Sequence, residues 1–516
     1  MKRRLAQLFP PLPLVLPSVV SGLLLTLCFP SFSAWPLCFV ALVPLFAGLL
    51  RARPSRADSF KAMYLCGVVF YVTLMWWIAK LLPSAGATIP WVLAPAVFIV
   101  AFYLAVYPAL GFVLLSTVTR YRFAAFVVAA PAVWVIADLA RSQGELAFPW
   151  GALGYALTTV PPLIQSASAF GLFGLTFLIV LVNVLVTGAI VVQNVRLRVV
   201  SFVSGLIVVG CMWGQGYIAM SESALPQPEG TDTIKIAIIQ PNVDLEVKWK
   251  PEFKDSTLKL IERLTREAAT LDVELIVFPE TCAPVYIDGR LPVFKHTLLT
   301  LARELDVSIY IGFLNHDYDG PNGELNIYNS SGLVTPDGWL VKYDKRHLLP
   351  FGEQLPLSWK YRWLRKINFG QSNFFPGSPK PPLEVSGTSF TPLICFESVV
   401  PYLCREGVEQ GAGILVNITN DGWFGDTPGP FQHAQMSILR AVEFRRYLVR
   451  SANSGVSMVV DPAGRVLSSL GLYVQGILTA DIVPLDGQTF YSRFGDWPVF
   501  ILSILLIAAA ALVPRR

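Results

Sequence analysis

Charged residues are scarce in this chain of 516 residues: Asp, Glu, Lys and Arg make up 15% of it, whereas hydrophobic residues make up 54%. Soluble domains carry about 25% charged residues, so the composition excludes a chain that lies wholly in water. Acidic residues are nearly absent from 1–220 and 491–516, and most of them fall in 221–490. We therefore expect the acid-poor parts of the chain to lie in lipid and the acid-rich part to lie in water.

Cysteine pairs and metal-binding clusters are also missing. The seven cysteines form no CxxC pair, and none stands with histidines at the spacing of a metal site. Neither a zinc site nor a disulfide framework is expected, and we start from a mechanism without metal or other cofactor. The net charge is only +5 and no run of Lys and Arg is present, so nucleic acid is not an expected partner.

Eight apolar segments approach the length of a membrane span, for which about 20 residues are needed. They lie at 12–29, 35–50, 60–79, 90–118, 123–140, 163–193, 198–219 and 494–513. We expect a polytopic helical membrane domain with seven spans in 1–220 and a closing span in 491–516. The first two segments are short, and they form either two spans or a re-entrant hairpin. A cleaved signal peptide is disfavoured, because a second apolar run follows at once and no small-residue cleavage site is present.

Basic residues flank these segments at alternate connections. They are Lys2, Arg3, Arg4, Arg51, Arg53, Arg56, Lys61, Arg120, Arg122, Arg196, Arg198, Arg515 and Arg516. Cations in short connections favour the cytoplasmic side of a membrane. We therefore expect a protein of the bacterial inner membrane whose residues 221–490 lie in the periplasm.

The stretch 221–490 alternates short β-branched runs with amphipathic segments, which is typical of an α/β domain. Strands are predicted at 234–240, 274–278, 307–313, 391–395 and 414–419, and helices at 252–271 and 431–446. The residues Asp461 to Gly464 predict a turn between two late strands.

Three reactive side chains stand near the ends of predicted strands, where a rigid sheet holds them in place. Glu280 follows the run 275–279, Cys395 ends the run 391–395, and Lys345 lies in the segment 343–353. Taken singly, each has a plain structural explanation: a solvated acid, a buried inert thiol and a surface cation. Their order and their neighbours favour a catalytic explanation.

The motifs Phe278-Pro279-Glu280, Lys345 to Glu353 (KRHLLPFGE) and Cys395-Phe396-Glu397 together resemble the nitrilase superfamily, whose members use Glu, Lys and Cys from successive strand ends. The fusion to several spans resembles one branch of it, the apolipoprotein N-acyltransferase family, over essentially the whole chain. The resemblance implies an αββα sandwich for 221–490.

The resemblance also implies residue roles. Glu280 would act as general base, Cys395 as the nucleophile that carries the acyl group as a thioester, and Lys345 as the charge that stabilises the oxyanion together with the backbone N–H of Phe396. The family often has tyrosine at position 396, so no role that needs a phenol hydroxyl is carried over.

Three further residues match positions on which the family relies, namely Trp249, Glu353 and Glu397. We expect Glu353 to orient Lys345 or to tune Glu280 by its like charge, and Glu397 to pair locally.

The substrates implied by the resemblance are a phospholipid as acyl donor and the N-terminal amine of a diacylated apolipoprotein as acceptor, and we expect the chain to act as a monomer in the membrane. One alternative is a membrane-anchored nitrilase or amidase that lets water resolve its acyl-enzyme. Another is a transporter or binding protein. Transporters place ionisable residues within their spans, whereas Asp138 is nearly the only acid within the apolar segments.

The stretch 355–376 interleaves aromatic with basic residues, including Trp359 and Trp363. This mixture favours the headgroup layer of a membrane, and it predicts an arm that rests on the bilayer beside the site. A packed loop is the alternative. Trp423 and Phe424 are expected to complete an apolar entrance for acyl chains.

Overall fold

The computed structural model describes residues 9–81, 90–223, 232–288, 292–319, 324–338, 340–358, 360–367 and 372–513. The chain forms two compact units. A helical unit comprises 1–80, 91–224 and 494–516, and a mixed unit comprises 81–90 and 225–493. The basic residues at 2–4 and 515–516, which entered the topology prediction, lie outside the described residues, as does Trp359.

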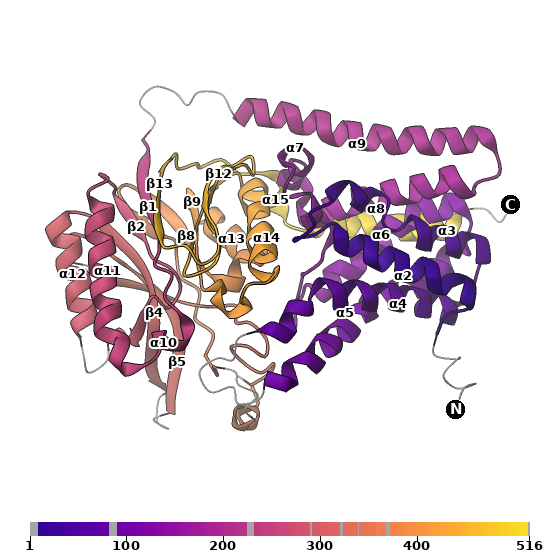
Figure 1. The fold of residues 1–516 in the computed structure, drawn as a ribbon. Coiled ribbons are helices and arrows are strands. Elements are labelled where there is room, and N and C mark those ends of the chain that lie inside the picture. The colour runs from indigo at the N-terminus through magenta and orange to yellow at the C-terminus, as the bar shows by residue number, and fades with distance from the viewer. Residues whose placement is uncertain are drawn as a thin grey trace. The chain divides into compact units, whose positions relative to one another are not determined.

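The helical unit is built from apolar helices of 4 to 30 residues (Figure 1). They are α2 (Leu12–Leu27), α3 (Val43–Ala52), α4 (Arg56–Leu74), α5 (Pro90–Thr119), α6 (Phe123–Arg141), α7 (Pro161–Ile164), α8 (Ala167–Val191), α9 (Val195–Ser223) and α16 (Trp497–Leu512). Among the described residues, six helical segments are long and apolar enough to cross a membrane. The predicted polytopic domain is confirmed, although α2 and α16, with 16 residues each, are shorter than a full crossing.

An ion pair accounts for the acid within the apolar segments. Arg141 Nε lies 2.8 Å from Asp138 Oδ1, and both side chains are buried. Arg141 Nη1 also donates to the carbonyls of Phe148 and Trp150, each at 2.8 Å. The arginine thereby organises the loop that follows α6, and Asp138 has a structural explanation.

The mixed unit contains two β-sheets. The first holds β1 (Ile234–Gln240), β2 (Leu275–Val277), β3 (Ala283–Tyr286), β4 (Ser308–Asp319), β5 (Glu324–Val334), β6 (Leu340–Asp344) and β13 (Gly476–Ile482), in the order β13-β1-β2-β4-β5-β6 with β3 beside β4. The second holds β7 (Leu383–Val385), β8 (Thr388–Ile394), β9 (Ile414–Thr419), β10 (Tyr447–Ala452), β11 (Ser457–Val460) and β12 (Val466–Leu470), in the order β12-β11-β10-β9-β8-β7. Strands β1, β2 and β4 run parallel, as do β8, β9 and β10, so each set ends at one edge of its sheet.

Alternation along β1 shows how the layers pack. Ile236 and Ile238 belong to the core between the two sheets, together with Ile418 of β9. Ala237 and Ile239 face the other way and pack with α11 (Lys254–Ala269) and α12 (Val293–Leu305). Helices α13 (Pro401–Glu409) and α14 (Gly429–Phe444) contact β8 and β10 on the far side of the second sheet (Figure 1). The four layers form an αββα sandwich, as predicted.

Candidate active site

Glu280, Lys345 and Cys395, called the triad below, follow the ends of β2, β6 and β8. Lys345 Nζ lies 3.7 Å from Glu280 Oε1, and both side chains are buried. The thiol of Cys395 is close enough to both that their charges are among those that set its pKa. The structure therefore brings together three residues separated by 115 positions of sequence, counting from 280 to 395.

Two further groups order the lysine and the acid. Glu353 Oε2 lies 2.8 Å from Lys345 Nζ, and it also accepts the N–H of Leu349 at 2.8 Å. Asn329, in the middle of β5, donates from one Nδ2 atom to Glu280 Oε1 at 2.6 Å and to Glu353 Oε1 at 2.9 Å. The two carboxylates are thus bridged by an amide on one side and by the lysine on the other.

The second oxygen of Glu280 is held by the backbone that follows β9. The N–H of Asn420 donates to Glu280 Oε2 at 2.8 Å. Both carboxylate oxygens therefore have fixed donors, and the orientation of the carboxyl group is determined before any substrate arrives. The contacts of Asn329 and Asn420 with Glu280 were not predicted from the sequence, because only strand pairing brings these residues to Glu280.

The pKa values of the triad follow from its burial. Burial raises the pKa of Glu280, and the negative charge of Glu353 adds to this while Lys345 opposes it. Burial and the charge of Glu280 raise the pKa of Cys395, against the effect of Lys345. Burial alone would lower the pKa of Lys345, but the surrounding negative charges outweigh it and raise this pKa well above its usual value. At rest, the site holds a protonated thiol, an acid with increased proton affinity and a fixed positive charge.

Cys395 does not continue β8, which corrects the predicted strand 391–395. The strand ends at Ile394, and Cys395 begins the short helix η7 (Cys395–Val399) with φ at 52°, in the left-handed region. Its carbonyl accepts the hydroxyl of Ser398 at 3.0 Å and the amide of Asn417 at 3.3 Å. Such strained backbone is found at functional sites, where neighbouring groups hold it in place.

A buried network lies behind this turn. Arg450 donates from Nη1 to the Asn417 side-chain oxygen and from Nη2 to Asp421 Oδ2, the latter at 2.7 Å. His433 Nδ1 lies 2.8 Å from Asp421 Oδ1. Although burial raises the pKa of Asp421, Arg450 and His433 outweigh this and lower it to about 2. The amide of Asn417, which holds the Cys395 carbonyl, is therefore itself oriented by a buried ion pair.

Glu397 connects the lysine to the thiol through the backbone. It is fully buried and accepts the N–H of Ile394, immediately before the thiol, at 2.8 Å. It also accepts the N–H groups of Arg346 and His347, immediately after the lysine, at 2.7 and 3.0 Å, and the hydroxyl of Tyr343 at 3.0 Å. One carboxylate thus fixes the separation of the two chain segments that present the lysine and the thiol.

Replacing Glu397 by glutamine is expected to lower the rate at which Cys395 reacts with iodoacetamide by about tenfold to a hundredfold, because an amide nitrogen would face the backbone N–H donors and shift the two segments. A buried donor left without an acceptor also costs about 1–3 kcal/mol of unfolding free energy. Urea unfolding and the rate of alkylation by iodoacetamide measure the two effects. Glu409→Gln, at an exposed position of α13, serves as the matched control. Wild-type values for Glu397→Gln would show that the carboxylate does not fix this geometry.

Comparison with known proteins gives the family. Residues 21–185 match the apolipoprotein N-acyltransferase N-terminal domain, and residues 235–489 match the carbon-nitrogen hydrolase family. An apolipoprotein N-acyltransferase of Geobacter metallireducens is 34% identical over 508 residues, which cover 97% of this chain and 95% of that one. The chain belongs to the apolipoprotein N-acyltransferase family. A further member, from Photobacterium profundum, is 30% identical over 97% of this chain and 95% of its own length.

Membership of the apolipoprotein N-acyltransferase family makes the chain an acyltransferase enzyme and confirms its carbon-nitrogen hydrolase fold. Among solved structures, Saccharomyces cerevisiae Nit3 of the nitrilase superfamily is 21% identical, with a TM-score of 0.39 over 55% of this chain and 96% of that chain.

Phe396 and Trp249, which the apolipoprotein N-acyltransferase resemblance also singled out, have contacts of their own. Phe396 is buried, and its ring stacks on His347 with centroids 5.7 Å apart. Burial lowers the pKa of His347 to about 4, so this ring is neutral near pH 7. The ring of Trp249 lies 5.8 Å from the ammonium group of Lys248. The role of the Phe396 N–H at an oxyanion stays a prediction.

The predicted arm and entrance contain exposed and half-buried aromatic side chains. Trp363 is 61% exposed on η6 (Arg362–Lys366). Trp423 and Phe424 are half-buried on η8 (Asp421–Phe424), directly after the residue whose N–H binds Glu280.

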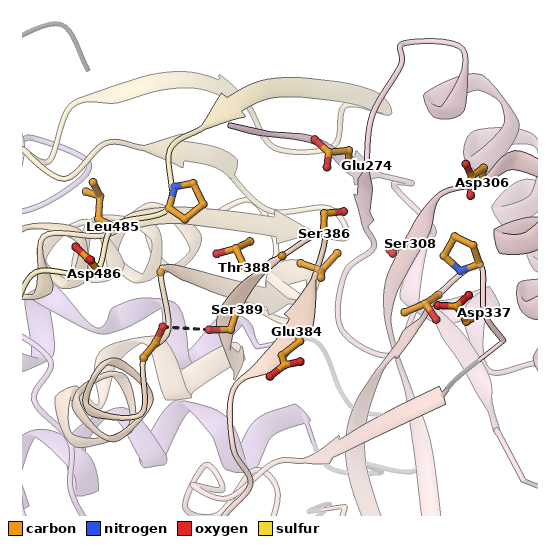
Figure 2. A pocket seen from close by; sticks show the side chains of 17 residues that line it. Glu274, Asp306, Ser308, Asp337, Glu384, Ser386, Thr388, Ser389, Leu485 and Asp486 are labelled. Atoms are coloured by element: carbon orange, nitrogen blue, oxygen red, sulfur yellow. Dashed lines mark hydrogen bonds between the residues drawn. The ribbon is translucent and has the colours of Figure 1, made fainter. Parts of the chain in front are cut away.

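A cavity of about 930 Å³ lies elsewhere in the mixed unit and is lined by carboxylates (Figure 2). They are Glu274, Asp306, Asp337, Glu384 and Asp486. Glu274 precedes β2, whereas Glu280 follows it, so this cavity opens at the strand edge opposite the triad. Within the described residues, no group of three His, Cys, Asp or Glu side chains is arranged to hold a metal ion.

Proposed function

We propose that this enzyme transfers a fatty acyl chain from a phospholipid to the N-terminal α-amine of a diacylglyceryl-cysteine in apolipoproteins, through a thioester on Cys395. The buried contact of Glu280 with Lys345 beside this thiol carries the proposal. The carbon-nitrogen hydrolase unit is fused to membrane-spanning helices, which suits substrates that do not leave the bilayer.

In the first half-reaction, Glu280 takes the thiol proton while Cys395 Sγ attacks the ester carbonyl of the phospholipid. The ammonium group of Lys345 stabilises the oxyanion of the tetrahedral intermediate. The carbon–oxygen bond to the glycerol then breaks, and Glu280 returns its proton to the departing oxygen. The products are a lysophospholipid and a thioester on Cys395.

In the second half-reaction, the neutral α-amine attacks the thioester and passes a proton to Glu280. The carbon–sulfur bond breaks, the sulfur of Cys395 takes the proton back, and an amide remains on the lipoprotein. The raised pKa of Glu280 suits both steps, because a group that must accept and then donate a proton works best with a pKa near the working pH.

Incubation with phospholipid labelled in its acyl chains tests the function. With enzyme and lipid alone, we expect no continuing release of labelled free fatty acid. When a diacylated lipopeptide with a free amine is added, we expect the label to be transferred to it. An acetylated lipopeptide is the control, since it lacks the attacking amine. Release of free fatty acid at the same rate with and without the amine would show a hydrolase instead.

The side of the membrane is proposed from the cations of the described connections. Arg53 lies between α3 and α4, Arg120 and Arg122 between α5 and α6, and Arg196 and Arg198 at the start of α9. Two long helices separate each connection from the next, α4 and α5 and then α6 and α8, since α7 has only four residues. All these connections therefore lie on one side, the cytoplasm of a bacterial inner membrane, with the mixed unit in the periplasm. Protease added to intact spheroplasts is expected to cleave 232–490, and protection of this unit would contradict the assignment.

The exposed aromatic side chains between β6 and β7 are proposed to rest in the headgroup layer. Tyr361 and Trp363 are 45% and 61% exposed, the aliphatic side chain of Leu357 is 47% exposed, and Lys360 lies 5.5 Å from the ring of Tyr361. Aromatic rings with neighbouring cations favour the interface between water and lipid.

Trp363→Ser is expected to raise KM for phospholipid vesicles about tenfold, which corresponds to about 1.4 kcal/mol of lost partitioning, and to leave the rate on a water-soluble thioester unchanged. Vesicle assays over a range of lipid concentrations measure this. Tyr318→Ser removes another aromatic ring, which is 68% exposed on β4. This variant should change neither KM for vesicles nor the rate on the water-soluble thioester. An unchanged KM for Trp363→Ser would favour the packed-loop alternative.

A further inference from the structure

Lys248 is a fully buried lysine beside the proposed base, and the mechanism above does not use it. It ends the short helix α10 (Leu245–Lys248). Its side chain is 1% exposed, and Nζ donates to the hydroxyl of Thr281 at 2.9 Å and to the carbonyl of Glu280 at 3.3 Å. The same ammonium group faces the ring of Trp249 at 5.8 Å. One cation therefore contacts both the turn that carries Glu280 and the ring of Trp249.

Burying the ammonium group of Lys248 is unfavourable in free energy unless neighbouring groups stabilise its charge. A buried ammonium group is normally paired with a carboxylate. Among the described residues, no carboxylate oxygen lies within 4.0 Å of Lys248 Nζ. Its direct partners are a hydroxyl, a carbonyl and an aromatic ring, so the charge acts on the neighbouring backbone and, through space, on the carboxylate of Glu280.

The turn that Lys248 holds is strained. Thr281 has φ at 47°, in the left-handed region that β-branched residues seldom adopt. The turn is also fixed by the carbonyl of Pro279, which accepts the N–H groups of Cys282 and Gly312, each at 3.3 Å. The side chain of Thr281 is used to bind Lys248, so the lysine and the strained backbone support each other.

We propose that Lys248 is a positioning residue of the acyl-transfer reaction, which fixes the Glu280 turn, joins it to the Trp249 segment and places a positive charge near the carboxyl group of Glu280. The inference rests on the proposed role of Glu280 as base and extends it. Lys248 itself does not touch the reacting atoms.

The electrostatics agree with this geometry. Burial raises the pKa of Glu280 and the charge of Glu353 adds to this, whereas Lys345, the hydrogen bond from Asn329 and the charge of Lys248 lower it. Burial lowers the pKa of Lys248 to about 8, and Cys282 and Glu280 oppose this shift. Lys248 is therefore mainly charged at pH values below about 8.

Two ionisable groups close to Lys248 or Glu280, the thiol of Cys282 and the ammonium group of Lys345, keep one charge state near pH 7. Burial raises the pKa of the Cys282 thiol to about 12. Asp244 and Glu246, on the same segment as Lys248, are exposed to solvent. Lys345, which also interacts with Glu280, has a pKa well above its usual value. The fall in reaction rate on the acidic side of the pH profile, called the acidic limb below, is thus expected to follow protonation of Glu280, whose pKa depends in part on the charge of Lys248.

The test compares Lys248→Met, Lys248→Arg and the control Lys250→Met, which removes an exposed lysine two residues away. Two pH profiles are measured on the full-length protein in detergent: alkylation of Cys395 by iodoacetamide, followed by peptide mass spectrometry, and single-turnover acylation by phospholipid. Lys248→Met is expected to move the acidic limb of both profiles upward by about one pH unit, with about a tenfold loss of rate below the limb. Lys248→Arg should restore the wild-type limb, and Lys250→Met should keep it.

A structural role alone would lower the melting temperature or the amplitude of alkylation without moving the limb, and this result would overturn the proposal. Arginine at 248 that fails to restore the limb while the protein stays folded would also overturn it. The alkylation profile needs no lipid. A shifted alkylation limb with no acylation by phospholipid in any variant, wild type included, would support the role of Lys248 while contradicting the proposed function.

Discussion

Cys395→Ala is expected to abolish acyl transfer, with a loss on the order of 10⁴-fold or more, because no other group in the triad can form the covalent intermediate. The buried pair of Glu280 and Lys345 stays in place in this variant, so lipid binding should persist without turnover. Mass spectrometry of the wild-type protein mixed with phospholipid alone should find one acyl mass on Cys395, and the variant should carry none.

Cys404→Ala provides the matched control. This thiol lies nine positions later, on α13, is buried and unpaired, and its pKa is raised to about 12 by burial. Its removal takes away the same atoms without affecting the triad, so activity should stay at the wild-type level. An acyl adduct on another residue, or full activity of Cys395→Ala, would contradict the thioester mechanism.

The elements that were predicted correctly from the sequence are those whose structure follows from the spacing of apolar residues within one segment. The strands predicted at 234–240 and 414–419 coincide with β1 and β9, and the helix at 252–271 contains α11. These segments are apolar on both faces or strictly amphipathic. All eight predicted spans overlap helices, because the length of an apolar run is itself set by the bilayer.

Strands β5 and β6 were missed, because polar residues interrupt their apolar pattern. β5 reads ELNIYNSSGLV, and its central Asn329 is buried only because β4 and β6 pair on either side of it. The sequence offers no signal that this asparagine bridges Glu280 and Glu353, since residues 49 and 24 positions away are brought to it by strand register.

The candidate site was predicted in its residue types but not in its supporting contacts. Glu280, Lys345 and Cys395 were expected to converge from strand ends, and the structure brings them together. Glu397 was expected to pair locally, whereas its partners include two backbone N–H groups of a segment about 50 positions earlier. Backbone partners of this kind leave no mark in the sequence, because any residue supplies an N–H group.

Glu280→Gln is expected to lower kcat/KM by about 10²-fold to 10⁴-fold, because the amide cannot take the thiol proton. The burial that raises the pKa of Glu280 also predicts the pH dependence. A carboxyl must be ionised to act as base, so the wild-type rate should fall as the pH is lowered through this raised pKa. The glutamine variant should lose this acidic limb, and its residual rate should rise only with ionisation of the thiol at higher pH.

Glu274→Gln makes the same exchange at the other end of the same strand, where the carboxylate is exposed and accepts the N–H of Lys235 at 3.2 Å. It should keep the wild-type rate and the wild-type limb. Glutamine at 280 is nearly isosteric and can still accept one of the two hydrogen bonds from Asn329 and Asn420, so a folded variant is expected. If that folded variant kept both rate and limb, the proton would have to pass to Glu353, the neighbouring carboxylate that shares Asn329 and Lys345 with it. A Glu353→Gln variant that alone lost the acidic limb would then transfer the role of base to that residue.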